Sequence, residues 1–312
     1  MKKLLLLILA LTLLSGCNTE SPNSNIDSGT YTPIKITTEN GKEVLTSSLD
    51  SAQKGNQSSN AGDIGKQFTN TALSKVRAKL SSIRAREIYS STSVLPGSCG
   101  GTETLNAKID VETNEFTIDI DYKAYCDAET EETLNGRLSA TGEFTLFNGE
   151  VTFKLSLDNF RLISTINNED LSMSGTAITS MQFDTMSVNM TLNFTIKDFV
   201  TNKDIILENF VFSSVDIHDD SLTYLYTQEE MNGRVYQSDI GYIDITTTTP
   251  FKVKYDNNPH EGSLIMKGAD DSQLALIAID DTQYQLNIDE DGDGTPEEME
   301  TNAWDNLELG LF

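Results

Sequence analysis

The feature that most constrains the fold of this chain is a period-two alternation of apolar and polar residues, which runs from about residue 102 to residue 288. Over residues 188–196 every even position is apolar and every odd position is polar. The same alternation occurs over residues 116–122 and 151–158. Because successive side chains of a β-strand point to opposite faces, each such segment predicts a strand with one buried and one solvated face.

Turn-forming residues separate these segments, at Asn135-Gly136, Asn148-Gly149, Asn232-Gly233 and Asn257-Asn258-Pro259. Such residues favour tight hairpins, so we expect about ten to twelve antiparallel strands. The apolar faces of so many strands need a cover. The predicted fold class is therefore mainly β, a large antiparallel sheet arranged either as a two-sheet sandwich or as one curled, open half-barrel. The half-barrel is similar, at the level of the fold alone, to periplasmic carriers of lipoproteins.

One amphipathic helix is predicted over residues 66–90, ahead of the strands. Large apolar residues recur there mostly at three- and four-residue steps, which gives one apolar stripe: Phe68, Leu73, Val76, Leu80 and Ile83. Five basic residues decorate the same segment, Lys75, Arg77, Lys79, Arg84 and Arg86. We interpret this basic patch as a surface that docks on the protein's own acidic sheet. The alternative is a contact with anionic lipid or with a partner.

Residues 17–65 are dominated by Ser, Asn, Thr, Gly and Gln. Few large apolar groups are available there to offset the entropy lost on ordering. We therefore expect a flexible tether over residues 17–65, the helix over 66–90, and a β domain over 91–312.

The N-terminus carries two lysines, Lys2 and Lys3, an apolar run over residues 4–14, and then Ser15-Gly16-Cys17. The run is shorter than the ~20 residues that span a bilayer, and the pattern is typical of an export signal. The sequence Leu14-Ser15-Gly16-Cys17 resembles the lipobox of bacterial lipoproteins. This resemblance implies that residues 1–16 are a signal peptide and that Cys17 is acylated and becomes the first mature residue. Asn18, rather than Asp, implies outer-membrane delivery under the enterobacterial sorting rule.

Charge and cysteine content add two constraints. Removal of Lys2 and Lys3 with the signal leaves 20 basic and 48 acidic side chains, a formal charge of −28. Such a surface repels nucleic acid, so we expect no nucleic-acid partner. The expected partner is the membrane, because the lipobox resemblance implies a lipid anchor. Cys99 and Cys126 remain as an even pair in an oxidising compartment and predict a structural disulfide.

Residues 289–300 carry the one motif with recognisable chemistry. Carboxylates alternate through Asp289, Asp291 and Asp293, and Gly294 permits a sharp turn. The segment resembles the twelve-residue EF-hand calcium loop. The resemblance implies Ca²⁺ ligands at Asp289, Asp291, Asp293, Glu297 and Glu300 and a backbone carbonyl at Thr295. Two features depart from the family: a strand is expected before the loop, and Pro296 stands at position eight. Pro296 also predicts that a helix follows the loop.

Catalytic signatures are scarce. The sequence contains no GxSxG, HExxH or P-loop motif, and its two histidines are His218 and His260. We read His218 as a solvated strand end rather than a metal ligand, and His260 as a loop residue. The leading hypothesis is a non-catalytic, lipid-anchored envelope protein, a binding, adhesion or structural module with another envelope protein as its partner. The alternatives are a carrier or binder of an apolar ligand, such as a lipid or lipoprotein, and a secreted hydrolase.

Overall fold

The computed structural model describes residues 31–60, 88–110, 112–145, 149–166, 168–182, 185–219, 221, 223–254, 258–304 and 307. All of them belong to one compact unit, Tyr31–Phe312. The described elements are α2 (Gly41–Asn60), β1 (Ile88–Pro96), β2 (Gly100–Asp110), β3 (Glu115–Asp127), β4 (Glu132–Thr145), β5 (Glu150–Ser164), β6 (Glu169–Gln182), β7 (Ser187–Asp198), β8 (Lys203–His218), β9 (Tyr224–Gln237), β10 (Gly241–Val253), β11 (Glu261–Lys267), η3 (Ala269–Asp271), β12 (Gln273–Ala278), β13 (Gln283–Asp289) and β14 (Glu298–Ala303).

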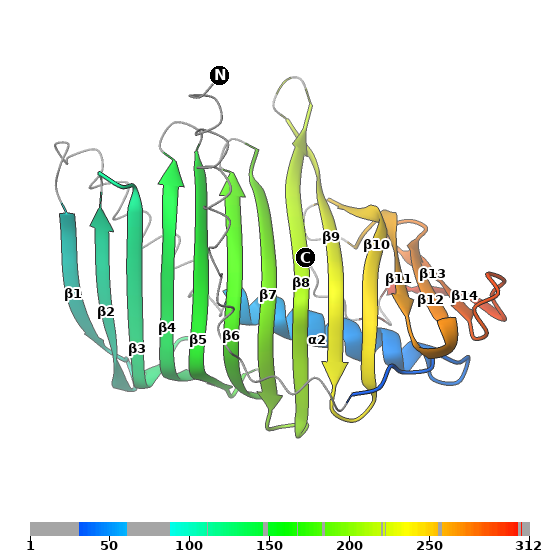
Figure 1. Ribbon diagram of the computed structural model, residues 1–312, viewed down its shortest axis with the longest axis horizontal. Helices are drawn as coiled ribbons and strands as arrows, with labels where there is room; N and C mark the ends of the chain where they lie inside the picture. Colours follow the sequence, from blue (N-terminus) through cyan, green and yellow to red (C-terminus); the bar gives the residue numbers. More distant parts are fainter. Residues whose placement is uncertain are drawn as a thin grey trace, which may run out of the picture. The chain divides into compact units, whose positions relative to one another are not determined.

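The fourteen strands form a single sheet in chain order, each antiparallel to its neighbours (Figure 1). β1 and β14 lie at its two ends, so the sheet is open. The mainly β, antiparallel fold is confirmed. Of the two predicted arrangements, the two-sheet sandwich is wrong, because one sheet holds all the strands of the described residues. The strand count exceeds the prediction because strands also form outside residues 102–288.

The period-two alternation divides the sheet into two faces, as predicted. In β7, Met190, Leu192, Phe194 and Ile196 are buried, and the residues between them are partly exposed. In β3 the buried side chains are Phe116, Ile118, Ile120 and Tyr122. We call the face that carries these side chains the inner face of the sheet.

Two of the predicted hairpin turns lie inside long strands instead. Asn135-Gly136 lies within β4, near its start, and Asn232-Gly233 lies within β9. Both sites coincide with a shift in strand register, which marks a β-bulge. Gly136 has φ 103° and Gly233 has φ 144°, values that glycine adopts without strain. The same dipeptide chemistry that closes a hairpin therefore bends a continuous strand.

α2 packs on the inner face and crosses the strands (Figure 1). It contacts β7, β8 and β9 near its C-terminus, and its first residue, Gly41, contacts Ile288 of β13. One helical stripe is buried, at spacings of three and four residues: Gly41, Val44, Leu45, Ser48, Leu49, Ala52 and Gly55. The fit is close, because a Cβ at Gly55 would lie 1.9 Å from Leu207 Cδ1.

This helix corrects the predicted tether, because residues 41–60 belong to α2. The sequence pattern was missed because four of the seven stripe positions are Gly, Ser or Ala rather than large apolar residues. The helix predicted over residues 66–90 lies outside the described residues as far as residue 87, and residues 88–90 belong to β1. The signal peptide, Cys17 and residues 17–30 and 61–65 of the predicted tether also lie outside the described part of the chain.

A buried ion pair fixes the C-terminal half of α2 to the sheet. Lys54 Nζ lies 3.0 Å from Asp198 Oδ2 at the end of β7, and 3.0 Å from Asp50 Oδ2. The Asp198 side chain is 4% exposed, whereas that of Asp50 is 54% exposed. Burial alone would raise the pKa of Asp198, but the N–H of Thr201 and the Lys54 ammonium outweigh it and hold the pKa below its usual value.

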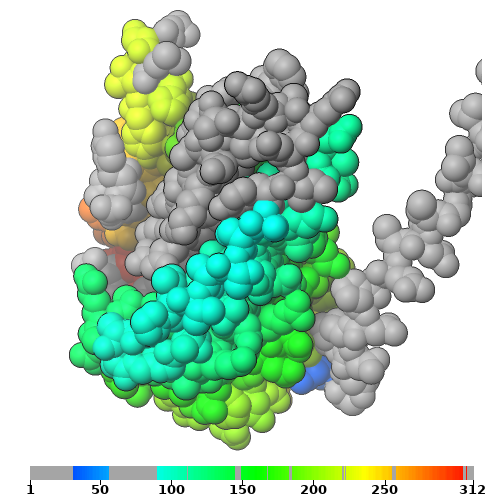
Figure 2. Space-filling view, turned by 90° about the vertical axis from the view of Figure 1, so that its left-hand side faces the viewer, coloured from blue at the N-terminus to red at the C-terminus, as the bar shows by residue number. Residues whose placement is uncertain are grey.

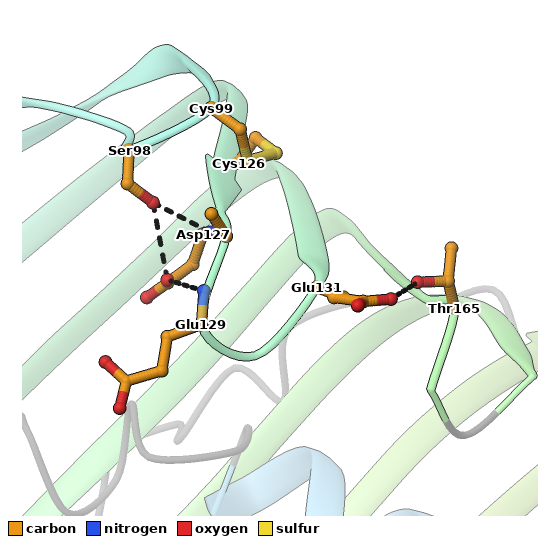
Figure 3. Close-up of a disulfide and its surroundings, with 8 residues drawn as sticks. Ser98, Cys99, Cys126, Asp127, Glu129, Glu131 and Thr165 are labelled. Atoms are coloured by element: carbon orange, nitrogen blue, oxygen red, sulfur yellow. Dashed lines mark hydrogen bonds between the residues drawn. A yellow bond between two sulfur atoms is a disulfide. The ribbon is translucent and has the colours of Figure 1, made fainter.

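The predicted disulfide between Cys99 and Cys126 is present (Figure 3). Cys99 lies in the turn between β1 and β2, and Cys126 lies near the end of β3. Beside it, the Ser98 hydroxyl accepts the N–H of Ala128 at 2.7 Å. The crosslink therefore fastens the terminal hairpin of the sheet to the next strand.

We predict that Asp198→Asn lowers the free energy of unfolding by about 1–3 kcal/mol at neutral pH, because Lys54 keeps its burial and loses its charged acceptor. Because the folded-state pKa of Asp198 is depressed, the wild-type advantage is present above the usual Asp pKa and is lost as the pH falls through the folded-state value. Urea unfolding of both proteins at neutral and acidic pH measures this difference.

Asp50→Asn is the matched control, since Asp50 contacts the same ammonium from the solvent side. Its effect should be about 0.5 kcal/mol or less. Equal losses in the two variants would contradict the assignment of Asp198 as the anchor of α2.

Candidate functional site: the acidic loop between β13 and β14

The acidic loop connects the last two strands of the sheet. β13 ends at Asp289, β14 begins at Glu298, and residues 290–297 join them. The two strands pair in regular register, with Ile288 opposite Glu298. The loop is thus carried by a rigid hairpin at one end of the sheet.

The carboxylate of Asp289 holds the first half of the loop by accepting two of its backbone N–H groups. Its side chain is buried, at 7% exposure. Its Oδ1 accepts the N–H of Gly292 at 2.7 Å, and its Oδ2 accepts the N–H of Gly294 at 2.9 Å. The loop must therefore fold back over one carboxylate, and it does so through glycines with φ 73° and 87°.

The other acidic side chains of the loop are held by backbone N–H groups. Asp291 Oδ1 accepts the N–H of Asp293 at 3.1 Å, and Asp293 Oδ1 accepts the N–H of Thr295 at 2.7 Å. Glu297 turns back towards the start of the loop, where its Oε2 accepts the N–H of Glu290 at 2.6 Å. The two Asp bonds are local Asx-type contacts, and together with the Glu297 bond they fix the directions of the carboxylates.

Three carboxylates converge. One oxygen from each of Asp289, Asp291 and Glu297 lies within 4.8 Å of the other two. Oxygen donors of this kind suit a hard cation such as Ca²⁺ rather than Zn²⁺. Among the described residues, no ion pair joins a basic side chain to any of the three. These three carboxylates are the residues that could hold a cation in this loop.

The other residues implied by the EF-hand resemblance do not join this cluster. Asp293 and Thr295 are exposed, and Asp293 lies outside the three converging carboxylates. Glu300 lies within β14, opposite Leu286, and forms an ion pair with Lys42. Its hydrogen bond with Lys42 is the main reason that the pKa of Glu300 is lowered.

The segment after the loop is a strand, so the expectation of a helix that begins at Pro296 is wrong. Glu298–Ala303 pairs with β13 along its whole length. The unpaired edge of β13 offers a ladder of backbone partners, and this tertiary contact overrides the local preference of Thr295, Pro296 and Glu298 for a helical start. The unit is therefore strand–loop–strand.

The loop also contacts the segment that leads into α2. Glu290 Oε1 accepts the N–H of Thr38 at 2.5 Å. Hydrogen bonding to Thr38, first through its side chain and then through this N–H, lowers the pKa of Glu290. Lys42, in the first turn of α2, pairs with Glu300. Two contacts thus tie the β13–β14 hairpin to the start of the helix.

The two histidines are separate from this loop. His218 is exposed at the end of β8 and packs edge-on against Tyr224, with ring centroids 6.0 Å apart. His260 packs in the same way against Tyr226, at 6.3 Å.

Sequence reasoning missed Glu229, which lies on the inner face of β9 between Ser214 and Phe251. Burial raises the pKa of its carboxyl to about 8, with a further contribution from Asp216. The buried Oε2 of Glu229 has no hydrogen-bond partner among the residues that the structure describes. Its place in the alternation of β9, in phase with Met231, was the signal that could have found it.

Comparison with known proteins gives one match. Residues 1–18 match the family described as a prokaryotic membrane lipoprotein lipid attachment site. The attachment site indicates a membrane-anchored envelope protein. No curated protein and no solved structure matches the chain. Within the described ranges, no helix combines the length and the apolar character that crossing a membrane requires.

We predict that Glu229→Gln stabilises the protein more at about pH 8.5 than at about pH 5. The folded-state pKa of Glu229 is about 8, above its usual value, so folding retains a proton that the unfolded chain releases at lower pH. The wild-type protein therefore loses stability as the pH rises towards 8, and the neutral amide avoids this loss. Urea unfolding at both pH values measures the effect, and an equal change at both would contradict it.

Proposed function

We propose that this chain is a lipid-anchored outer-membrane protein without catalytic activity, whose calcium-stabilised sheet acts as a binding, adhesion or structural module. The observation that carries the proposal is the combination of the lipid attachment site with one broad, open sheet. In the described part of the chain this sheet presents a wide solvated face.

The outer face of the sheet supports a binding role. A shallow depression of about 230 Å³ lies across β6, β7, β8 and β9. Seven of its ten lining residues are neutral and polar: Ser180, Gln182, Ser187, Asn189, Ser213, Ser214 and Gln228. The other three are Val188, Val215 and Glu230. Hydroxyl and amide groups of this kind suit hydrogen bonding to a polar partner and offer no nucleophile–base pair.

Calcium, in this proposal, stabilises the end of the sheet that holds α2. Asp289, Asp291 and Glu297 would hold the ion. The same hairpin contacts Thr38 through Glu290 and Lys42 through Glu300. An ordered loop would therefore favour the docked position of the helix start.

The apolar-carrier alternative receives no support beneath α2. At Gly55 and Gly41 the helix backbone touches Leu207 and Ile288 directly. At these two points α2 packs directly on the strands and leaves no room for an apolar ligand.

One observation favours the hydrolase alternative, namely the raised pKa of Glu229 beside Asp216. Paired carboxylates with separated pKa values are a recognised acid–base arrangement. Asp216, however, already accepts the hydroxyl of Thr227 at 2.8 Å, and both histidines pack against tyrosines. We therefore keep the non-catalytic module as the proposal.

We predict that about 5 mM Ca²⁺ raises the melting temperature by a few degrees relative to chelator, because an ion that binds the folded state stabilises it. Asp291→Asn and Glu297→Gln should abolish this shift. Both substitutions keep an oxygen that can accept the loop hydrogen bond but remove a charge from the cluster. Calorimetric titration of each protein with Ca²⁺ measures binding directly.

Glu300→Gln is the matched control, because Glu300 is the twelfth residue of the motif but lies outside the converging carboxylates. It should retain the calcium shift. Loss of the shift in Glu300→Gln with retention in Glu297→Gln would favour the EF-hand ligand set over the cluster, and equal melting temperatures in Ca²⁺ and chelator would remove calcium from the proposal.

Anchorage is tested by Cys17→Ala. The variant should lose incorporation of labelled palmitate and move from the membrane fraction to the soluble fraction, because the acyl chains supply the membrane affinity. Asn18→Asp is the paired test of address: under the enterobacterial sorting rule it should stay acylated but move to the inner membrane. A Cys17→Ala protein that still sediments with membranes would contradict the proposed anchor.

A further inference from the structure

β1 is an end strand with one edge paired. It pairs with β2 over all nine residues, from Ile88 to Pro96, without a shift in register. In the sheet order of the described residues no strand lies on its other side. A straight strand of this length presents a regular row of backbone N–H and C=O groups at that edge.

The two end strands of the sheet differ in charge. β14 carries Glu298 and Glu300, and such charges protect an edge from pairing with another chain. β1 has the sequence Ile-Tyr-Ser-Ser-Thr-Ser-Val-Leu-Pro and contains no charged residue. Its only protective residue is Pro96, at its end. In a chain with a net charge of −26, a neutral end strand repels a second acidic molecule less than the acidic end strand β14 does.

β1 also exposes apolar side chains. Val94 is 59% exposed and Leu95 is 49% exposed. Residues of β1 and β2, in cyan, lie at the end of the sheet that faces the viewer in Figure 2. The end of the molecule thus combines hydrogen-bonding backbone with apolar contact area.

The hairpin that carries β1 is held in place. The Cys99–Cys126 disulfide joins its turn to β3 (Figure 3). The N–H of Cys99 also donates to the carbonyl of Cys126 at 3.3 Å. Gly97 lies so close to this strand that a Cβ would approach Cys126 O to 2.5 Å. A strand that is already ordered loses little entropy when it pairs with another.

We propose that β1 pairs antiparallel with β1 of a second copy of this chain, about a two-fold axis at Thr92. This register is the one that pairs all nine residues, and it places Ser90 of each copy opposite Val94 of the other. The contact is isologous, so it closes as a dimer and does not propagate. It joins two open sheets into one continuous sheet.

A second copy fits this edge better than an unrelated strand because the lipid anchor brings copies together. One pair of nine-residue strands buries less than the ~1,000 Å² that a stable soluble dimer needs. Anchorage in one membrane raises the effective concentration of the partner, which converts a weak contact into a populated one. The dimer therefore belongs to the anchored protein, and dilution in solution dissociates it.

The test uses the full chain in its membrane and one added thiol, Thr92→Cys. Cys99 and Cys126 are already joined, and Cys17 is the acylation site, so the new cysteine is the reactive one. Mild oxidation should give a disulfide-linked band at twice the mass of the monomer on a non-reducing gel. Thr246→Cys is the matched control, since Thr246 is an exposed threonine of the interior strand β10, and it should give no such band.

A charge exchange separates strand pairing from random collision. In the Thr92→Cys background, Ser90→Lys with Val94→Lys places like charges opposite each other and should reduce the dimer band about tenfold. Co-expression with a Ser90→Glu, Val94→Glu partner should restore it as a mixed dimer. Failure of Thr92→Cys to crosslink, a crosslinked band of a different mass, or a dimer band insensitive to these charges would each overturn the proposal. A native Cys99–Cys126 bond in every variant confirms that the hairpin has folded.

Discussion

An open sheet with one apolar face must keep that face away from water, and most features of this structure follow from that requirement. The alternation in each strand creates the inner face, and α2 covers part of it across β7, β8 and β9. Close approach of the helix requires small residues in its stripe, of which Gly55 against Leu207 is the clearest. The Lys54–Asp198 ion pair then fixes the helix over the strands that it covers. Burial of this face, rather than any local helix preference, explains why α2 forms.

An open sheet also has two end strands, and in this chain they differ in charge and in the contacts that hold them. At β14 the end strand carries glutamates, and its hairpin holds the acidic loop and the start of α2 through Glu290 and Lys42. At β1 the end strand is neutral, and a disulfide fastens it. The charge of the two end strands matters because the whole chain is acidic. An acidic end strand discourages pairing and attracts cations. A neutral end strand permits contact between copies of the same acidic molecule.

Sequence patterns predicted the strands well and the connections poorly. Period two is a property of a single strand, so β3 and β7 could be recognised without knowledge of their neighbours. Asn-Gly pairs, by contrast, satisfy both a hairpin turn and a bulge, and Asn135-Gly136 lies within a strand because its partners on β5 continue past it. The sequence pattern did not predict α2, because close packing of a helix on a sheet selects small residues. Composition alone assigns such residues to a flexible tether. In the acidic loop the sequence identified Asp289, Asp291 and Glu297, but it could not separate them from Asp293 and Glu300.

The sequence by itself determined the mainly β fold class, the buried face of each strand, the Cys99–Cys126 pair and the acidic character of the loop, because each depends on local periodicity, composition or parity. Only the tertiary structure decided that all strands share one sheet, that residues 41–60 form a helix, and that Glu300 faces Lys42 while Glu297 turns towards Asp289. These outcomes depend on which surfaces meet across long separations in the chain. A local pattern records what a residue prefers, and the folded neighbours decide which preference is satisfied.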